Sequence, residues 1–263
     1  MKNTIAFPKM GLEFNIKNTF DVFGFTVHWY GVLIGIGLVL AVLFALRRKE
    51  RYGISAENVF DFVLIGLPSA VVGARLFYVI GDPECLSGGI LSAIAIWNGG
   101  LSIYGGLTFA VLSCLIYIKK KNISILKTLD FVAPSFMIGQ IIGRWGNFVN
   151  AEVFGGETEL LWGMSINAGP AVHPLFLYEG VWLLISLIVL VIYSKYNKKD
   201  GEIFALYLIW YGIGRMWMEA LRNEEYVLRI FNLPFSQLMS GAVILLGIFI
   251  IVYAYKKCAI RNA

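Results

Sequence analysis

The sequence predicts an all-α integral membrane protein: a bundle of about seven transmembrane helices, with an interfacial arm at the N-terminus and a polar loop on the outer side. Hydrophobic residues make up 58% of the 263 positions, and charged residues only 15%. A soluble domain has about 25% charged residues. The apolar residues are also grouped into separate long stretches with short basic clusters between them. Composition and grouping together indicate a polytopic membrane protein.

Seven stretches are long and apolar enough, or nearly so, to cross a bilayer. A helix needs about 20 mainly apolar residues to span the hydrocarbon core. The stretches that approach this length are residues 27–46, 59–80, 103–118, 124–143, 175–194, 203–221 and 237–255. They predict a helical bundle over residues 26–255.

The segments outside these spans are an arm at 1–25, links at 81–102 and 222–236, and a longer polar loop at 144–174. Leu12 to Ile16 alternate between apolar and polar residues with period two, which predicts a short strand or an interfacial arm. The chain contains no internal repeat and no low-complexity segment. We therefore expect one membrane domain over 1–263, without a cleaved signal peptide.

Basic residues predict the topology. They cluster on alternate connections, which the positive-inside rule assigns to the cytoplasm. The N-terminus is then outside and the C-terminus inside. This distribution explains the net charge of +5 better than nucleic-acid binding does. The clusters contain Arg47, Arg48, Lys49 and Arg51; Lys119, Lys120, Lys121 and Lys127; Lys195, Lys198 and Lys199; and Lys256, Lys257 and Arg261.

The sequence contains no recognisable metal or nucleotide motif. Cys85, Cys114 and Cys258 are the three cysteines, and their spacing fits neither a zinc site nor a disulfide framework. The chain has two histidines and no HExxH motif, and no phosphate-cradling P-loop. We expect no metal and no cofactor.

Four arginines lie within or at the ends of apolar spans: Arg75, Arg144, Arg215 and Arg222. An arginine at mid-membrane costs roughly 2.5 to 3.5 kcal/mol on insertion scales, so such residues usually have a function or a partner. Arg75 could reach the outer surface by snorkelling. Asp130, near the inner end of its span, is expected to cap a helix or pair with a lysine.

Arg215, Glu219 and Arg222 have the spacing of one helical face. Their simplest role is an internal salt bridge that lets the helix insert. Two arginines against one glutamate nevertheless leave a positive surplus, to which Arg144 adds. In a membrane, that surplus favours a lipid phosphate as the bound anion.

The stretch GRWGNFVNAEVFG at 143–155 places polar groups at the end of an apolar run. Asn147 and Asn150 offer amide donors and carbonyl acceptors, and Glu152 can accept hydrogen bonds or protons. The glycines at 143, 146, 155 and 156 permit a tight, non-helical path. We expect a polar pocket at the outer interface, because irregular backbone at membrane depth must be buried in protein or line a wet cavity.

This stretch resembles the G-R-x-G-N-F-x-N-x-E-x-x-G signature of the prolipoprotein diacylglyceryl transferases. Further motifs of that family are similar in the same order: VHWYG at 27–31, GGLSIYGGL at 99–107, HPLFLYE at 173–179 and GIGRMWMEALR at 212–222. The resemblance implies transfer of the diacylglyceryl group of phosphatidylglycerol to the lipobox cysteine of a prolipoprotein, with release of glycerol phosphate. It implies a bacterial plasma-membrane enzyme acting at the outer leaflet, without a cofactor. It marks Tyr30, Arg144, Asn147, Glu152, Gly155, Arg215 and Glu219 as functional.

We expect Arg144 and Arg215 to hold the phosphate and stabilise its departure. Asn147 and Glu152 would fix the headgroup or the loop, and Gly155 would permit the turn. Many family members have a histidine, often proposed as a base, where this chain has Tyr104. A free tyrosine has a pKa near 10 and is a poor base at neutral pH. Tyr30 and Tyr104 would therefore orient lipid or thiol, and the proton acceptor stays open among Glu152, Glu219, the phosphate and water.

Three other functions are alternatives to a diacylglyceryl transferase. A transporter for an anionic solute would also place arginines in a bundle, but transporters often contain internal repeats. A transferase for another phospholipid headgroup would keep the phosphate site and change the acceptor. A structural scaffold does not explain the clustered Arg, Asn and Glu. His173, in HP before a span, is expected to cap or hydrogen-bond the loop.

Overall fold

A computed structural model of the chain describes residues 2–83, 85, 89–197, 199–222, 229–230 and 233–262. Lys198 and most of the link at 222–236 lie outside these residues. Each of the seven predicted spans is a helix. The long helices are α1 (Trp29–Tyr52), α2 (Ala56–Gly81), α4 (Ile103–Lys120), α5 (Ile125–Asn150), α6 (Leu175–Tyr193), α7 (Glu202–Glu219) and α8 (Phe235–Asn262).

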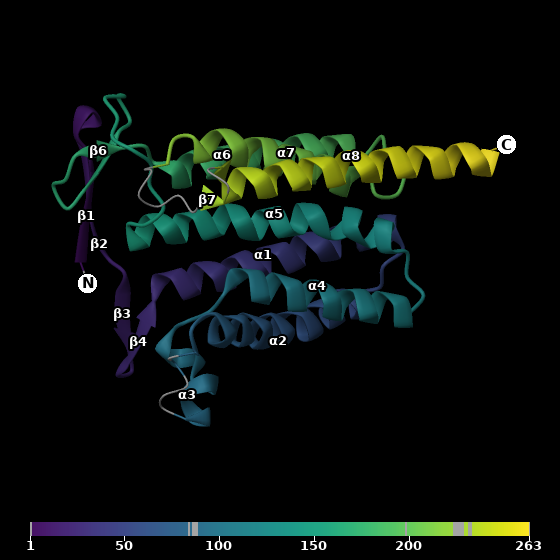
Figure 1. The fold of residues 1–263 in the computed structure, drawn as a ribbon, viewed down its shortest axis with the longest axis horizontal. Helices are drawn as coiled ribbons and strands as arrows, with labels where there is room; N and C mark the ends of the chain where they lie inside the picture. Colours follow the sequence, from purple (N-terminus) through teal and green to yellow (C-terminus); the bar gives the residue numbers. More distant parts are fainter. Residues whose placement is uncertain are drawn as a thin grey trace. The chain divides into compact units, whose positions relative to one another are not determined.

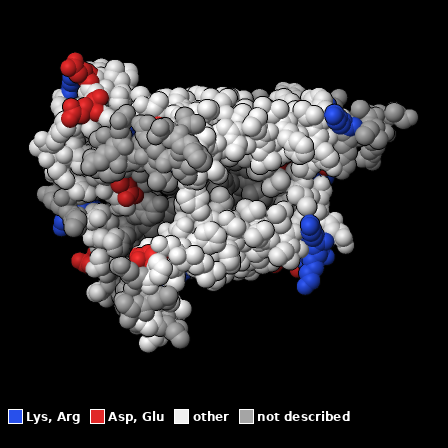
Figure 2. Space-filling view, in the orientation of Figure 1, with Lys and Arg blue, Asp and Glu red and all other residues white. Residues whose placement is uncertain are grey.

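Among the described residues, six of these helices are long and apolar enough to cross a membrane. The seventh long helix, α7, carries Glu202, Arg215 and Glu219 within 18 residues. Figure 2 shows that the flanks of the helices carry almost no charged side chains on the face drawn, and that the charges gather near helix ends. The prediction of a helical membrane protein is confirmed.

The helices belong to two compact units, Met1–Phe44 with Leu129–Ala263, and Ala45–Thr128. In the first unit, α5 to α8 share one apolar core, in which Met137, Leu183, Ile203 and Tyr207 are buried. The expectation of a single domain over 1–263 stays a prediction.

Asp130 of α5 fixes the start of α7. Its buried carboxylate accepts the backbone N–H groups of Gly201 at 2.7 Å and Phe204 at 2.8 Å. These are groups that the first turn of a helix leaves without an internal partner. Gly201 has a φ of +96°, which a glycine adopts without steric strain. The predicted capping role of Asp130 is confirmed.

An antiparallel sheet lies at the end of the first unit where α5 ends and α6 begins (Figure 1). Its strand order is β2-β1-β5-β6. The strands are β1 (Lys2–Phe7), β2 (Leu12–Lys17), β5 (Met164–Ile166) and β6 (Ala171–Val172). Ile5, Phe7 and Met164 are buried in a small core together with Phe176 of α6. This core joins the N-terminal arm to the loop before α6.

The alternating residues Leu12 to Ile16 belong to β2, so the choice between strand and arm is settled as a strand. A hairpin follows, made of β3 (Thr19–Val22) and β4 (Phe25–His28), and α1 begins at the next residue. Thus the N-terminal arm contains four short strands.

In the second unit, α2 and α4 pack closely, because Gly73 and Gly105 face each other. A Cβ added to Gly73 would lie 2.5 Å from the carbonyl oxygen of Gly105. The short helix α3 (Ile90–Ile94) precedes α4. The absence of side chains at the two glycines lets the backbones of the two long helices approach.

Snorkelling, the possibility considered for Arg75, does not occur. Its side chain is buried and donates to four backbone carbonyls within the second unit. They belong to Ser92 at 2.6 Å, Ala93 at 2.7 Å, Gly99 at 2.7 Å and Gly100 at 2.9 Å. Residues 92–100 turn these carbonyls toward the end of α2, so the guanidinium group finds partners in the protein and does not need solvent.

Candidate functional site

The helix α5 continues through the polar stretch that was expected to leave it. Arg144 to Asn150 are helical, so the polar loop predicted at 144–174 begins at Ala151, and the non-helical path predicted for Gly143 and Gly146 is wrong. Gly146 instead provides room for a neighbour: a Cβ added there would lie 2.5 Å from the ring of Tyr30. A glycine inside a helix costs about 1 kcal/mol relative to alanine, and here it allows α1 and α5 to approach.

The continued helix places Arg144 and Asn147 on adjacent turns of one face. The guanidinium group of Arg144 donates to the side-chain oxygen of Asn147 at 3.5 Å. The amide nitrogen of Asn147 donates in turn to Glu152 at 2.9 Å. The amide of Asn150 donates to the same carboxylate oxygen at 3.4 Å. Glu152 therefore holds both asparagines, and through Asn147 it orients Arg144.

The backbone turns sharply around Glu152. Ala151 and Val153 have φ angles of +55° and +59°, which residues other than glycine rarely adopt. The N–H of Glu152 donates to the carbonyl of Asn147 at 3.0 Å. Strained backbone of this kind persists where surrounding contacts over-determine it. The hydrogen bonds from Asn147 and Asn150 to Glu152 are such contacts.

Gly155 lies where three segments meet. Its N–H donates to the carbonyl of His173 at 2.9 Å, and the N–H of Gly156 donates to the carbonyl of Leu221 at 2.8 Å. A Cβ on Gly155 would lie 2.5 Å from the oxygen of Leu221 and 2.8 Å from the Cβ of His173. Its φ is outside the left-handed region. The glycine therefore serves close approach between segments, and the turn itself does not require it.

Four ion pairs join α5, α6 and α7 into one network. Glu179 of α6 pairs with Arg144 at 2.5 Å and with Arg215 at 2.8 Å. Glu219 pairs with Arg215 at 3.2 Å and with Arg222 at 3.6 Å. Three guanidinium groups thus share two carboxylates, which leaves one positive charge in the network.

The two signs of charge differ in exposure. The side chains of Glu179 and Glu219 are 4% and 3% exposed, whereas those of Arg144, Arg215 and Arg222 are between 18% and 25% exposed. The carboxylates therefore lie inside the network, and the guanidinium groups form its accessible edge. Such an edge can bind an anion bidentately, because guanidinium groups match the geometry of phosphate and carboxylate oxygens.

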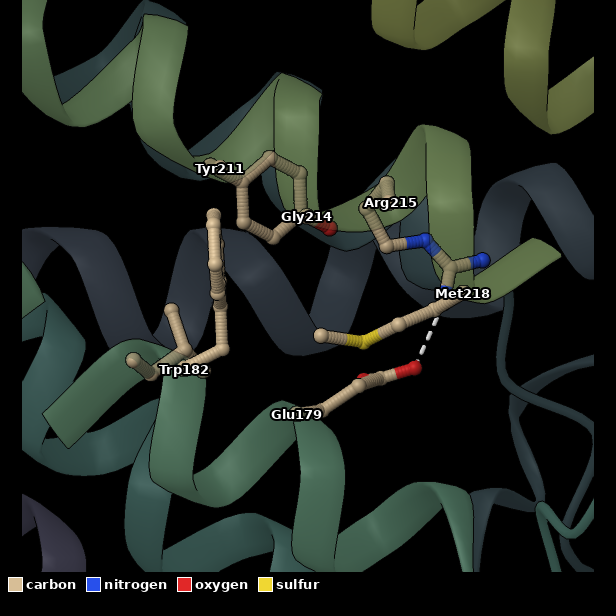
Figure 3. Close-up of a pocket in the computed structure, with 7 residues that line it drawn as sticks. Glu179, Trp182, Tyr211, Gly214, Arg215 and Met218 are labelled. Carbon is tan, nitrogen blue, oxygen red and sulfur yellow. Dashed lines mark hydrogen bonds and ion pairs between the residues drawn. The ribbon is translucent and has the colours of Figure 1, made fainter. Parts of the chain in front are cut away.

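The inner side of the Glu179–Arg215 pair is closely packed. Figure 3 shows Glu179 and Trp182 of α6 facing Tyr211, Arg215 and Met218 of α7. The cavity between them has a volume of only about 10 Å³. That is room for one water at most. A ligand of the network must therefore approach the exposed edges of the arginines.

Sequence reasoning did not assign a role to Glu179, which connects Arg144 to Arg215. A signal was available, since Glu179 is the one charged residue within the 19 residues of α6. A buried carboxylate at that position needs a cationic partner. The nearby arginines on two other predicted spans were the candidates.

His173 is bound to the loop through its backbone and its ring. Its N–H donates to the carbonyl of Gly156 at 3.0 Å, and its Nδ1 lies 3.2 Å from the hydroxyl of Tyr178. Partial burial lowers the pKa of His173 below its ordinary value. The loop hydrogen bond expected for His173 is confirmed.

Tyr30 and Tyr104 are the remaining predicted site residues. Tyr30 is in the first turn of α1 and packs on Gly146, with 38% of its surface exposed. Tyr104 is in the first turn of α4 and belongs to the second unit, where it is 57% exposed. The described residues include no group of three or more His, Cys, Asp or Glu side chains that could hold a metal ion.

Comparisons with a family model and with individual proteins point to the same family. Residues 17–253 match the family described as prolipoprotein diacylglyceryl transferase. A protein of Finegoldia magna named phosphatidylglycerol–prolipoprotein diacylglyceryl transferase is 41% identical over 244 residues, which cover 92% of this chain and 97% of that protein. A protein of Streptococcus pyogenes serotype M5 with the same name is 40% identical over 235 residues, or 86% of this chain and 90% of that protein.

Proposed function

Because the chain belongs to the prolipoprotein diacylglyceryl transferase family, we propose that it transfers the diacylglyceryl group of phosphatidylglycerol to a cysteine thiol of a prolipoprotein. It is a multi-span membrane transferase of a bacterial family. The acceptor is the cysteine of the lipobox, at the end of the signal peptide. The products are a thioether-linked diacylglyceryl protein and glycerol phosphate.

The exposed edge of the Arg144–Glu179–Arg215 network is the observation that carries this proposal. Arg144 and Arg215 lie on either side of one buried carboxylate, with both guanidinium groups partly exposed. A lipid phosphate between them would receive charge-assisted hydrogen bonds from two helices. Cations placed where negative charge develops contribute several kcal/mol to a transition state in a site that excludes water.

The reaction is a displacement at carbon. The thiolate sulfur attacks the glyceryl carbon that carries the phosphoester oxygen, and a carbon–sulfur bond forms as the carbon–oxygen bond breaks. The electron pair of the broken bond leaves with glycerol phosphate. Arg144 and Arg215 stabilise the charge that gathers on the departing phosphate. Free cysteine titrates near pH 8.5, so modest assistance gives enough thiolate at neutral pH.

The two candidate carboxylate bases are already engaged by other side chains. Glu219 lies between Arg215 and Arg222, and Glu152 accepts from Asn147 and Asn150. The released phosphate monoester has a second pKa near 6 and can itself take up a proton. We therefore assign Glu152 to positioning Asn147 and the loop, and the thiol proton to the phosphate or water.

The orientation in the membrane follows from the basic clusters. The helix α1 ends among Arg47, Arg48, Lys49 and Arg51, and α4 is followed by Lys121. Placing these clusters in the cytoplasm puts the N-terminus and the end of α5 outside and the C-terminus inside. Arg144, Asn147 and Glu152 would then face the outer leaflet, where a secreted prolipoprotein emerges.

The test uses the purified full chain in vesicles containing phosphatidylglycerol, with a lipobox peptide as acceptor. The expected result is a peptide whose mass increases by one diacylglyceryl group, with release of an equal amount of glycerol phosphate. A peptide with Cys→Ser should give no product. Flux of an anionic solute without any lipidated peptide would instead support a transporter. Transfer from another phospholipid, and not from phosphatidylglycerol, would reject the proposed donor.

A further inference from the structure

An apolar groove lies on the surface of the first unit, between α6, α7 and the loop that precedes α6. It has a volume of about 300 Å³, and its walls include Trp162, Tyr178, Val181, Trp182, Ile185 and Trp217. None of the described residues that line it is charged. Val181 and Ile185 are 47% and 46% exposed, so the groove is open along the flank of α6.

Hydrogen bonds hold the aromatic walls in place. The indole nitrogen of Trp182 donates to the carbonyl of Trp210 at 3.0 Å, and that of Trp210 donates to the carbonyl of Trp182 at 3.2 Å. Trp162 donates to the hydroxyl of Tyr178 at 2.7 Å, and the ring of Tyr178 stacks on Trp217. The polar atoms of Trp162, Tyr178 and Trp182 are therefore occupied, and apolar faces are left to line the groove.

Gly214 is what allows Trp182 to take this position. A Cβ on Gly214 would overlap the indole of Trp182, so any larger residue would push the ring away from α7. Because its place is fixed from two sides, Trp182 forms a rigid wall. Preorganised walls of this kind reduce the entropy lost when a ligand binds.

The groove adjoins the charged network at Trp182. The same indole lines the small cavity beside Glu179 and Arg215 (Figure 3). Tyr178, on the wall of the groove, directly precedes Glu179 in the sequence. A ligand whose anionic head binds the exposed edges of the arginines would then have the groove beside it for an apolar tail.

We propose that this aromatic groove binds one acyl chain of the glycerophospholipid whose phosphate lies at Arg144 and Arg215. The inference rests on the proposed function and extends it to the apolar part of the donor. A phospholipid carries phosphate and chain in one molecule, which fits the adjacency of network and groove. The volume lies at the lower end of the usual range for ligand sites, roughly 300 to 1,000 Å³, and the open flank lets the chain continue into the membrane.

The first experiment fills the groove. Val181→Trp adds an indole at an exposed wall position, and Leu246→Trp makes a comparable change on α8, at a residue that is 49% exposed and does not line the groove. In the transfer assay, Val181→Trp should raise the KM for long-chain phosphatidylglycerol by about tenfold, the low end of the effect of one methylene group in an apolar pocket. The KM for dihexanoyl phosphatidylglycerol and for the lipobox peptide should not change.

Several results would overturn the inference. An unchanged KM for the long-chain lipid, or an equal rise in Leu246→Trp, would show that the groove does not take the chain. A higher KM for the peptide alone would assign the groove to the signal peptide. An equal rise for long-chain and short-chain lipid would indicate that the substitution disturbs the phosphate site.

The second experiment does not depend on turnover. Phosphatidylglycerol with a photoreactive diazirine on one acyl chain is bound to the full chain in vesicles and irradiated. Labelled peptides should contain residues 177–185 or 217, and Val181→Trp should reduce that labelling. Transfer without labelling of these peptides would reject the acyl-chain site in the groove and leave the proposed function standing. Labelling without transfer would reject the proposed function while supporting a lipid-chain site.

Discussion

Glu179 on α6 lies 2.5 Å from the guanidinium group of Arg144 on α5, and its second oxygen lies 2.8 Å from Arg215 on α7. One buried carboxylate thus fixes the two arginines that we assign to the phosphate. Carboxylates buried between cations are costly to remove, because the partners lose their neutralising charge. The geometry of the site therefore depends on a residue that need not touch the substrate.

Replacing Glu179 with Gln should destabilise the protein and couple to Arg144. Breaking a buried ion pair from one side costs about 3 to 5 kcal/mol, and the partial exposure of the arginines should reduce this toward the lower value. The measurement is a double-mutant cycle of Glu179→Gln and Arg144→Ala, with unfolding followed in detergent micelles. A coupling energy of about 0.5 to 3 kcal/mol is expected for residues in one network. Strict additivity would contradict the linkage.

Arg144→Ala should abolish diacylglyceryl transfer, with a fall in kcat of about a hundredfold or more, typical of a lost transition-state donor. Arg144→Lys keeps the charge but loses the planar fork, so it should retain part of the activity. The amount of each variant in the membrane fraction is the control for insertion. Near-normal lipidation by Arg144→Ala would reject the phosphate role.

Gly155 and Gly156 form a matched pair for testing close approach. Gly155→Ala would place a methyl group against the oxygen of Leu221, whereas at Gly156 the same atom would be 3.9 Å away, an ordinary contact. Overpacking costs about 1 to 3 kcal/mol, so Gly155→Ala should lower the Tm and the transfer rate. Gly156→Ala should behave like the unchanged protein. Equal effects at both positions would indicate a shared role that the contacts do not explain.

The pH dependence of stability should carry a contribution from His173. Burial lowers its pKa below the ordinary 6.5, so the unfolded chain binds a proton more readily than the folded one. Stability from this residue is present above pH 6.5 and falls as the pH drops through that value toward the lowered pKa. His173→Gln should flatten the fall in Tm between pH 7 and 5. A parallel pH profile in the two proteins would exclude this contribution.

Much of the fold could be predicted because long apolar stretches in the sequence identify the helices that can span a membrane. The seven helices, the strand at Leu12 to Ile16 and the capping role of Asp130 all follow from local pattern. The end of α5 was predicted too early, because glycines such as those at 143 and 146 often interrupt a helix. The sequence does not reveal that Tyr30 of another helix fills the space beside Gly146.

The candidate site was predicted only in part, for a related reason. Spacing along one helix indicates that Arg215, Glu219 and Arg222 share a face. It does not indicate which residue of another helix pairs with them. The signal for Glu179, the one charged residue of its span, was not used. The partners of Arg75 could not be predicted because they are backbone carbonyls of residues 92–100. Every residue has a backbone carbonyl, so the sequence does not show which ones will accept a hydrogen bond. Tertiary partners of this kind need the structure.

The cap that Asp130 provides for α7 has a mechanical consequence at the opposite end of both helices. Arg144 follows Asp130 by fourteen positions on α5, and Arg215 follows Gly201 by fourteen positions along α7. At 1.5 Å per residue, each interval corresponds to roughly 21 Å of helix. The two intervals are thus equal in length. They are linked at one end by the carboxylate of Asp130 and at the other end through Glu179. If either helix moved by one turn along its axis, Arg144 and Arg215 would no longer lie at the same level. The cap by Asp130 therefore keeps the two phosphate-binding arginines side by side.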